Sequence, residues 1–167
     1  MEYLIIGFVV LSIIGSMMWV MPTKRDRMLA TLRMQAKQQG FQVQLTKLTY
    51  PREHGEVDAR VVPSVAYRLL RGKISAQQHT QWKSWRVVRC ATNSSEGLSS
   101  GWGWALGERT MAEPQLAKIN TVLKSLPKDV VGLESTPVHV SVFWSEKDEQ
   151  ELEPIKLALD SMITELI

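Results

Sequence analysis

Residues 3–21 read YLIIGFVVLSIIGSMMWVM, nineteen residues without a formal charge. At about 1.5 Å per residue, a helix of this length rises roughly 29 Å, close to the hydrocarbon thickness of a bilayer. Backbone groups inside a bilayer must pair within their own segment, so the stretch is expected to be helical. The sequence therefore predicts a transmembrane anchor over residues 1–22, with a domain attached to it.

Two other interpretations of this stretch fit the sequence less well. A cleaved signal peptide would need a basic leader and an apolar core of about 7–15 residues, whereas the chain begins with Met1 and Glu2 and its apolar run is longer. A helix buried in a larger core would have to be enclosed on all sides. A retained anchor is favoured over both alternatives.

The charges beside residues 3–21 predict an orientation. Lys24, Arg25 and Arg27 follow the apolar run, and no basic side chain precedes it. The positive-inside rule then places the N-terminus outside and the remainder in the cytoplasm. We therefore expect a single-pass protein of the bacterial inner membrane. The residues assigned to the anchor are Tyr3, Gly7, Ser12, Gly15, Ser16 and Trp19.

Ser12 and Ser16 form a small-xxx-small pattern, which permits close helix packing. A helix–helix contact within the membrane is one interpretation, and chance is the other. Trp19 suits a position at the headgroup level.

The charge of the chain is unevenly distributed. Residues 22–95 contain fourteen Lys or Arg and four Asp or Glu, whereas residues 96–167 contain six and twelve. The basic half suits anionic lipid head groups, although the two halves could instead neutralise each other after folding. The basic residues assigned to lipid contact are Lys24, Arg25, Arg27, Arg33 and Lys37.

A basic juxtamembrane helix is predicted over residues 23–40. Thr23 and Asp26 have the spacing of a capping box, and Gly40 lies where a helix often ends. Cys90 is the single cysteine, so an internal disulfide is excluded and a reducing compartment is favoured.

Residues 41–167 are predicted to form one α+β domain. Residues 41–48 alternate apolar and polar side chains, which indicates a strand, and further strands are expected near 65–70, 82–91, 101–107, 130–134 and 138–144. Helices are expected from Ser75, from Glu113 and from Ser145 onward. Short connections favour a mostly antiparallel sheet with helices on one face.

No catalytic or metal-binding motif stands out. His54, His79 and His139 are isolated in the sequence, so a zinc site has no local support. Cys90 is more typical of a buried strand residue than of a nucleophile. We therefore expect no enzyme activity, no metal and no cofactor.

Five tryptophans outside the anchor suggest a binding surface or an aromatic core. Core packing, a groove for a peptide or apolar ligand, and a surface for single-stranded nucleic acid are all compatible with them, the last being disfavoured by the acidic second half. The candidates for partner binding are Trp82, Trp85, Arg86, Trp102, Trp104 and Trp144.

The apolar run followed by MPTKRDRMLATLRMQAKQQGFQVQL resembles small bitopic inner-membrane proteins of gram-negative bacteria, such as the YajC-type accessory subunit of the preprotein translocase. The resemblance covers residues 1 to about 45 and implies an accessory role in protein translocation. The leading hypothesis is a non-catalytic adaptor that binds a protein partner at the membrane. The alternative is a membrane-associated enzyme or a domain that binds a lipid or another apolar ligand.

Overall fold

A computed structural model describes residues 2–19, 21–52, 59–92 and 94–167. The chain divides into two compact units, residues 1–34 and residues 35–167. Each unit is described by itself below.

The first unit is helical. Helix α1 spans Glu2–Trp19 and helix α2 spans Lys24–Gln38, and the latter continues into the second unit. The predicted capping box is confirmed: the Asp26 backbone N–H donates to Thr23 Oγ1 at 3.2 Å, and the Thr23 N–H donates to Asp26 Oδ2 at 2.9 Å. The Thr23 hydroxyl also donates to Asp26 Oδ2 at 2.6 Å, and this bond together with the Thr23 N–H bond lowers the pKa of Asp26.

The predicted transmembrane anchor over residues 1–22 is wrong. Across the described ranges, no helix combines the length and the apolar character that crossing a membrane requires. Helix α1 is described over the 18 residues Glu2–Trp19, which rise about 27 Å, and Glu2 carries a charge in its first turn. The bitopic topology, the inner-membrane location and the transmembrane part of the predicted fold rested on that anchor and are corrected with it.

The second unit is an α+β domain built on one antiparallel sheet of six strands in the order β1-β2-β6-β5-β3-β4. The α+β class, the antiparallel sheet and its position after residue 40 agree with the prediction. The strands are β1 (Gln42–Thr49), β2 (Val61–Leu70), β3 (Trp85–Arg89), β4 (Trp102–Leu106), β5 (Val130–Ser135) and β6 (His139–Trp144). The helices that follow α2 are α3 (Ala76–Gln81), α4 (Glu113–Ser125), the short 3₁₀ turn η1 (Glu149–Glu151) and α5 (Leu152–Thr164).

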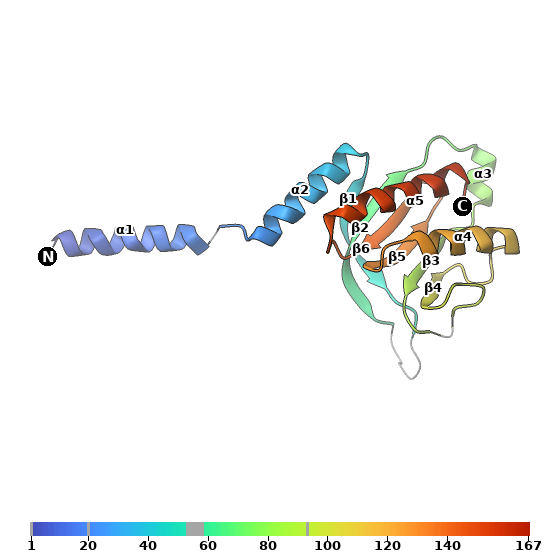
Figure 1. Ribbon diagram of the computed structural model, residues 1–167, viewed down its shortest axis with the longest axis horizontal. Helices are drawn as coiled ribbons and strands as arrows, with labels where there is room; N and C mark the ends of the chain where they lie inside the picture. The colour runs from blue at the N-terminus through green and yellow to red at the C-terminus, as the bar shows by residue number, and fades with distance from the viewer. Residues whose placement is uncertain (1, 20, 53–58, 93) are drawn as a thin grey trace. The chain divides into compact units, whose positions relative to one another are not determined.

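Helices α4 and α5 cover one face of the sheet, as Figure 1 shows. The core lies between these helices and the sheet. Register pairs Tyr67 with Val142, Val142 with Leu133, and Leu133 with Val87, and paired side chains share a face. All four are fully buried. The helices contribute Ile119, Val122, Leu123, Leu152, Ile155, Leu159 and Met162.

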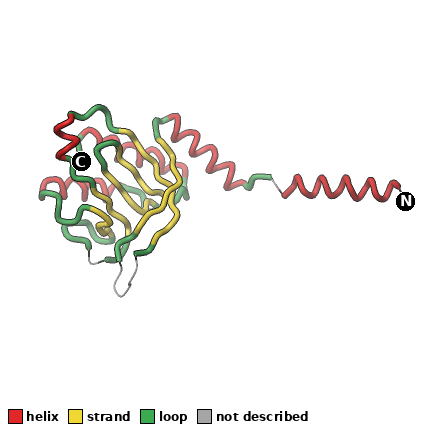
Figure 2. The backbone as a smooth tube through the Cα atoms, turned by 180° about the vertical axis from the view of Figure 1, so that it is seen from behind, coloured by secondary structure: helices red, strands yellow, loops and turns green. Residues whose placement is uncertain are grey.

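No helix lies in front of the opposite face of the sheet where Figure 2 views it. We call this the open face, and define it by the side chains that alternate with the core residues on the strands, such as Arg68, Ser141, Glu134 and Arg86. Each residue in this series is the direct register partner of the next, so the four side chains form a row across the sheet.

The last helix begins later than its sequence predicts. Asp148 caps η1 by accepting from the Gln150 N–H at 3.0 Å, and α5 starts only at Leu152. Ser145 instead directly follows strand β6, and its N–H donates to the Asp129 carbonyl at 3.2 Å. Glu146 then turns the chain with a left-handed φ of 54°. The tertiary bond at Ser145 therefore outweighed the local capping signal.

Candidate functional site

The row of polar side chains across the open face is the candidate site. Antiparallel register places Gln42 opposite Arg68, Arg68 opposite Ser141, Ser141 opposite Glu134, and Glu134 opposite Arg86. Five strands therefore each contribute one residue. His139 lies two residues before Ser141 and so points to the same face.

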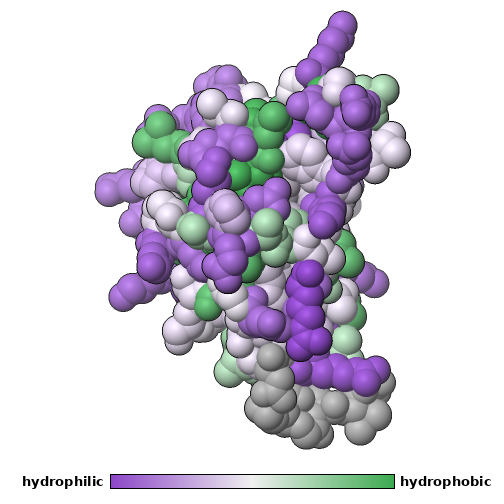
Figure 3. Space-filling model, turned by 90° about the vertical axis from the view of Figure 1, so that its right-hand side faces the viewer, coloured by the Kyte–Doolittle hydropathy of each residue, from purple (hydrophilic) through white to green (hydrophobic). Residues whose placement is uncertain are grey.

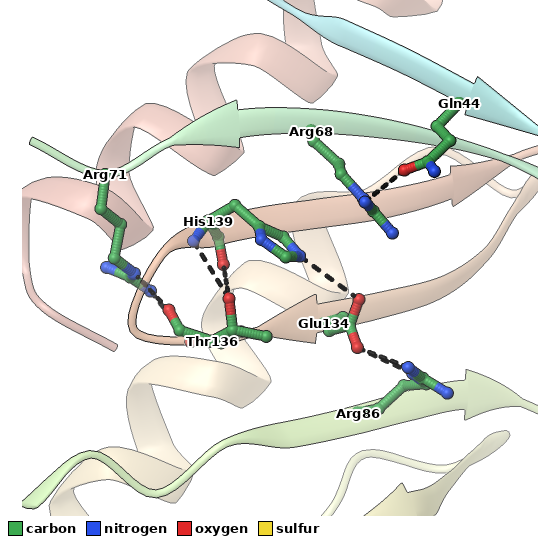
Figure 4. A network of polar contacts seen from close by, with 8 residues as sticks. Gln44, Arg68, Arg71, Arg86, Glu134, Thr136 and His139 are labelled. Atoms are coloured by element: carbon green, nitrogen blue, oxygen red, sulfur yellow. Dashed lines mark hydrogen bonds and ion pairs between the residues drawn. The ribbon is translucent and has the colours of Figure 1, made fainter. Parts of the chain in front are cut away.

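Glu134 is the centre of the row's contacts (Figure 4). Its Oε1 accepts from Arg86 Nε at 3.1 Å and from Arg86 Nη2 at 2.5 Å. Its Oε2 lies 3.7 Å from His139 Nε2, which is an ion-pair distance if His139 is protonated but too long for a hydrogen bond. On the far side of the row, Arg68 donates through Nη1 to the side-chain oxygen of Gln44.

Three buried polar atoms of this region have no hydrogen-bond partner among the described residues: Arg68 Nε, His139 Nε2 and Ser141 Oγ. Ser141 is fully buried beneath its longer neighbours. A buried polar group left unpaired is unfavourable by about 1–3 kcal/mol, so such groups mark sites where a partner atom would be bound with a gain.

Electrostatics keep His139 neutral. Burial lowers the pKa of its imidazole, the nearby Arg68 charge lowers it further, and the Glu134 carboxylate opposes both. At neutral pH the row therefore carries two positive charges, on Arg68 and Arg86, and one negative charge, on Glu134. The Arg86 charge is matched by Glu134, whereas the hydrogen-bond partner of Arg68 among the described residues is the neutral Gln44.

Ser141, His139 and Glu134 are the residue types of a hydrolytic triad, but their geometry is not that of one. Ser141 Oγ makes no hydrogen bond to His139, and its side chain is fully buried, so a substrate could not reach it. The arrangement can donate hydrogen bonds to an anion or a carbonyl. It does not assemble a nucleophile.

The open face becomes apolar beside this row. Leu48, Tyr50, Ala66, Val88 and Phe143 form a buried cluster, and the Arg86 guanidinium lies 5.8 Å from the centroid of the Phe143 ring. Arg60 lies over Tyr50 with its Cζ 4.7 Å from the ring centroid. The apolar cluster gives the polar row a rigid base, because its members are close-packed.

The six predicted partner-binding residues divide into three groups. Four rings are buried on the helix-covered face, where Trp85 and Trp104 meet edge to face at 6.3 Å. Arg86 belongs to the open face, and Trp82 lies at the end of the domain near α3. The buried rings are Trp85, Trp102, Trp104 and Trp144.

A cavity of about 310 Å³ lies beside Trp82. Figure 3 looks onto the side of the molecule that carries α3, α4 and the C-terminus, and apolar residues (green) show there between polar ones. Trp82 Nε1 is buried without a partner among the described residues. The cavity is lined by Gln78, Gln81, Trp82, Lys83, Trp85, Met111, Gln115, Leu166 and Ile167.

The residues predicted to contact lipid or to form the anchor lie in α1 and α2. In α1, Tyr3, Gly7, Ser12, Gly15 and Ser16 are exposed, and Ser16 Oγ donates to the Ile13 carbonyl at 2.8 Å. The side chain of Trp19 lies outside the described part of the structure, as does His54. In α2, Arg33 is half-buried and the other predicted contacts, Lys24, Arg25, Arg27 and Lys37, are exposed.

Sequence reasoning missed most of the polar row. In the sequence His139 is an isolated histidine, and the predicted site residues include neither Arg68 nor Glu134 nor Ser141. A usable signal was present, because Arg68, Arg86 and Glu134 are each a charged residue inside an otherwise apolar strand segment. Their meeting on one face depends on the strand order, which local sequence does not encode.

Among the described residues, no group of three or more His, Cys, Asp or Glu lies close enough to hold a metal ion. No protein-family model matches the chain, and neither a curated protein nor a solved structure matches it. The resemblance of residues 1–45 to the YajC-type subunit stays a prediction. The candidate site therefore rests on its geometry.

Proposed function

We propose that this chain is a protein-binding accessory module and that its open face holds an acidic segment of a partner protein. The observation that carries the proposal is the row of Arg68, Ser141, Glu134 and Arg86, in which the half-buried Arg68 guanidinium is hydrogen-bonded to the neutral Gln44. A guanidinium that no carboxylate among the described residues neutralises favours an anionic partner group.

A carboxylate fits this chemistry better than a neutral group. The planar guanidinium can donate two parallel hydrogen bonds to a carboxylate, and such charge-assisted bonds are about twice as strong as neutral ones. Arg86 is already paired with Glu134, so Arg68 is the residue that would bind the partner's carboxylate. Gln44, its present partner, is neutral and exposed.

Exposed apolar side chains beside the row add contact area. Leu70 is opposite His139 in the register and 53% exposed, and Leu106 is opposite Arg86 and 51% exposed. Arginine combined with exposed apolar residues is typical of protein–protein interfaces. A partner that covered the row would also bury these two leucines.

Site-specific photo-crosslinking tests this proposal. A photoreactive amino acid replaces Leu70 or Leu106 on the open face, and replaces Leu157, 63% exposed on α5, as the matched control. We expect one protein to crosslink from both open-face positions and not from Leu157. That protein, once purified, should bind the wild-type chain at least ten-fold more tightly than Arg68→Glu.

The salt dependence gives a second readout, since an interaction through exposed charges weakens as ionic strength rises. Crosslinking that is equal at all three positions would contradict the proposal. So would an identified partner whose affinity is unchanged by Arg68→Glu, provided the variant keeps the circular dichroism spectrum of the wild type.

A second candidate function is the binding of a small apolar ligand in the cavity beside Trp82. Its volume of about 310 Å³ lies at the lower end of ligand pockets, and the Lys83 ammonium is available at its wall. Lys83 Nζ at present donates to the Thr110 carbonyl at 2.9 Å. The dye 1-anilinonaphthalene-8-sulfonate, apolar with one anionic group, is a suitable probe: binding that Trp82→Ala leaves unchanged would exclude this cavity.

A further inference from the structure

The two edges of the sheet differ in how they are protected. At one edge, β4 is only five residues long, and its pairing with β3 contains a register shift. The Trp104 N–H donates to the Ser94 carbonyl at 2.6 Å, so a loop occupies part of that edge. Short strands, irregular pairing and covering loops are the means by which proteins prevent edge-to-edge association.

At the other edge, β1 has almost none of these protections. It is eight residues long, and all eight pair with β2 without a register shift. Its sequence, QVQLTKLT, contains no proline or glycine and a single charge at Lys47. Within the described part of the chain, no strand pairs with its outer edge.

Leu45 marks the middle of this edge. Its side chain is 74% exposed, which makes it one of the most exposed large apolar residues of the domain. An exposed apolar residue on a long, regular edge strand favours pairing with another strand.

We infer that two copies of this chain associate through antiparallel pairing of β1 with β1, with the two-fold axis at Leu45. The two six-stranded sheets would then form one continuous sheet. A two-fold interface uses the same surface of both copies, so the strand must be complementary to itself when reversed. The sequence of β1 meets this condition.

The register about Leu45 brings no like charges together. Leu45 lies opposite Leu45 of the second copy, Gln44 opposite Thr46, and Val43 opposite Lys47, whose aliphatic stem can cover the valine. A shift of the axis to Lys47 would place two ammonium groups directly opposite each other, which is unfavourable. Self-complementarity therefore favours a second copy over an unrelated extended segment, and the Lys47 charge excludes the register that is centred on it.

Disulfide trapping tests the interface and its register together. The single native cysteine is first removed by Cys90→Ser, which leaves the full chain without thiols. Leu45→Cys then places two thiols on the axis, where directly opposed Cα atoms lie about 4.5–5.5 Å apart, within the Cα–Cα range that a disulfide spans. Leu157→Cys provides an exposed thiol on α5 as the control.

We expect Leu45→Cys to form disulfide-linked dimers at least ten-fold faster than Leu157→Cys. Val43→Cys should form few, because its nearest counterpart on the second copy is displaced by four residues. Sedimentation velocity of the wild-type chain should show a concentration-dependent dimer, weakened at least ten-fold by Leu45→Lys.

Three results would overturn the inference: equal crosslinking at residues 45 and 157, equal crosslinking at 43 and 45, or a monomer at 100 µM. Association through another surface, such as the exposed apolar side chains of α1, would give the first of these. The circular dichroism spectrum of each variant establishes that it is folded before it is compared.

Discussion

The Arg71 guanidinium lies over the ring of Trp82, with its Cζ 4.3 Å from the ring centroid. The same group donates from Nη2 to Ser135 Oγ at 2.9 Å and from Nε to the Thr136 carbonyl at 2.9 Å. Its Nη2 also donates to the backbone oxygen of Ile167. One buried cation therefore connects β2, the β5–β6 hairpin, the segment after α5 and the wall of the cavity.

Replacing Arg71 should destabilise the domain strongly. Arg71→Met removes these hydrogen bonds and leaves the acceptors buried, and we expect the free energy of unfolding to fall by about 3 kcal/mol. Urea denaturation followed by tryptophan fluorescence measures it. Arg109→Ala, which breaks an exposed ion pair with Glu96, is the control and should change stability little. An unchanged midpoint for Arg71→Met would contradict the proposed role.

The contribution of Glu151 to the stability of the domain should fall as the pH rises from about 4.5 to about 7. The Asp129 carboxylate and burial raise the pKa of Glu151 from 4.5 to about 7, and Trp144 Nε1 donates to both carboxylates. The folded state therefore binds the Glu151 proton more tightly than the unfolded state does. The resulting stabilisation is complete below pH 4.5, the pKa of Glu151 in the unfolded chain, and it is lost as the pH rises through about 7, its pKa in the folded domain.

Glu151→Gln tests this coupling. Allowing for solvent screening of a partly exposed group, we expect the variant to exceed the wild type by about 1 kcal/mol at pH 8 and to match it near pH 4.5. Urea denaturation at intervals between these values gives the two curves. Glu149→Gln removes a charge from the same turn and is the control. Parallel curves for the wild type and Glu151→Gln would refute the coupling.

Gly103 should tolerate no side chain. A Cβ atom there would lie 2.1 Å from Thr92 Cγ2 and 3.1 Å from Cys90 Sγ, so Gly103→Ala should destabilise the domain by about 2 kcal/mol. Gly72 has an ordinary φ and nothing within 4 Å of its added Cβ, so Gly72→Ala is the matched control. Thermal unfolding of both variants is sufficient, and equal stability would show that the β4 edge is less tightly covered than described.

His139 should titrate below its ordinary pKa, and Glu134→Gln should lower that pKa further. Burial and Arg68 lower the pKa of His139, and the Glu134 carboxylate is the group that opposes them. Nuclear magnetic resonance of the imidazole as a function of pH measures the midpoint directly. A midpoint that rises in Glu134→Gln would mean that the two side chains are not in contact in solution.

Local sequence predicted many of the elements and the fold class of the domain. The alternation of residues 41–48 gave β1, the Ser75–Gln78 pair gave the capped helix α3, and Glu113–Pro114 marked the start of α4. These signals are short-range, since strand alternation and helix caps involve residues at most four apart. The anchor prediction was wrong because it rested on the apolar composition of residues 3–21, and no described helix is long and apolar enough to cross a membrane.

Residues far apart in the chain decided the rest. Arg68, Ser141, Glu134 and Arg86 form one row only because β6 pairs between β2 and β5, and β3 pairs outside β5. The same order buries Trp85 and Trp104 under the helices and leaves β1 at an edge. The sequence by itself determined which segments become strands and helices. The pairing of distant strands, which local propensity does not specify, decided which side chains meet and which remain open to a partner.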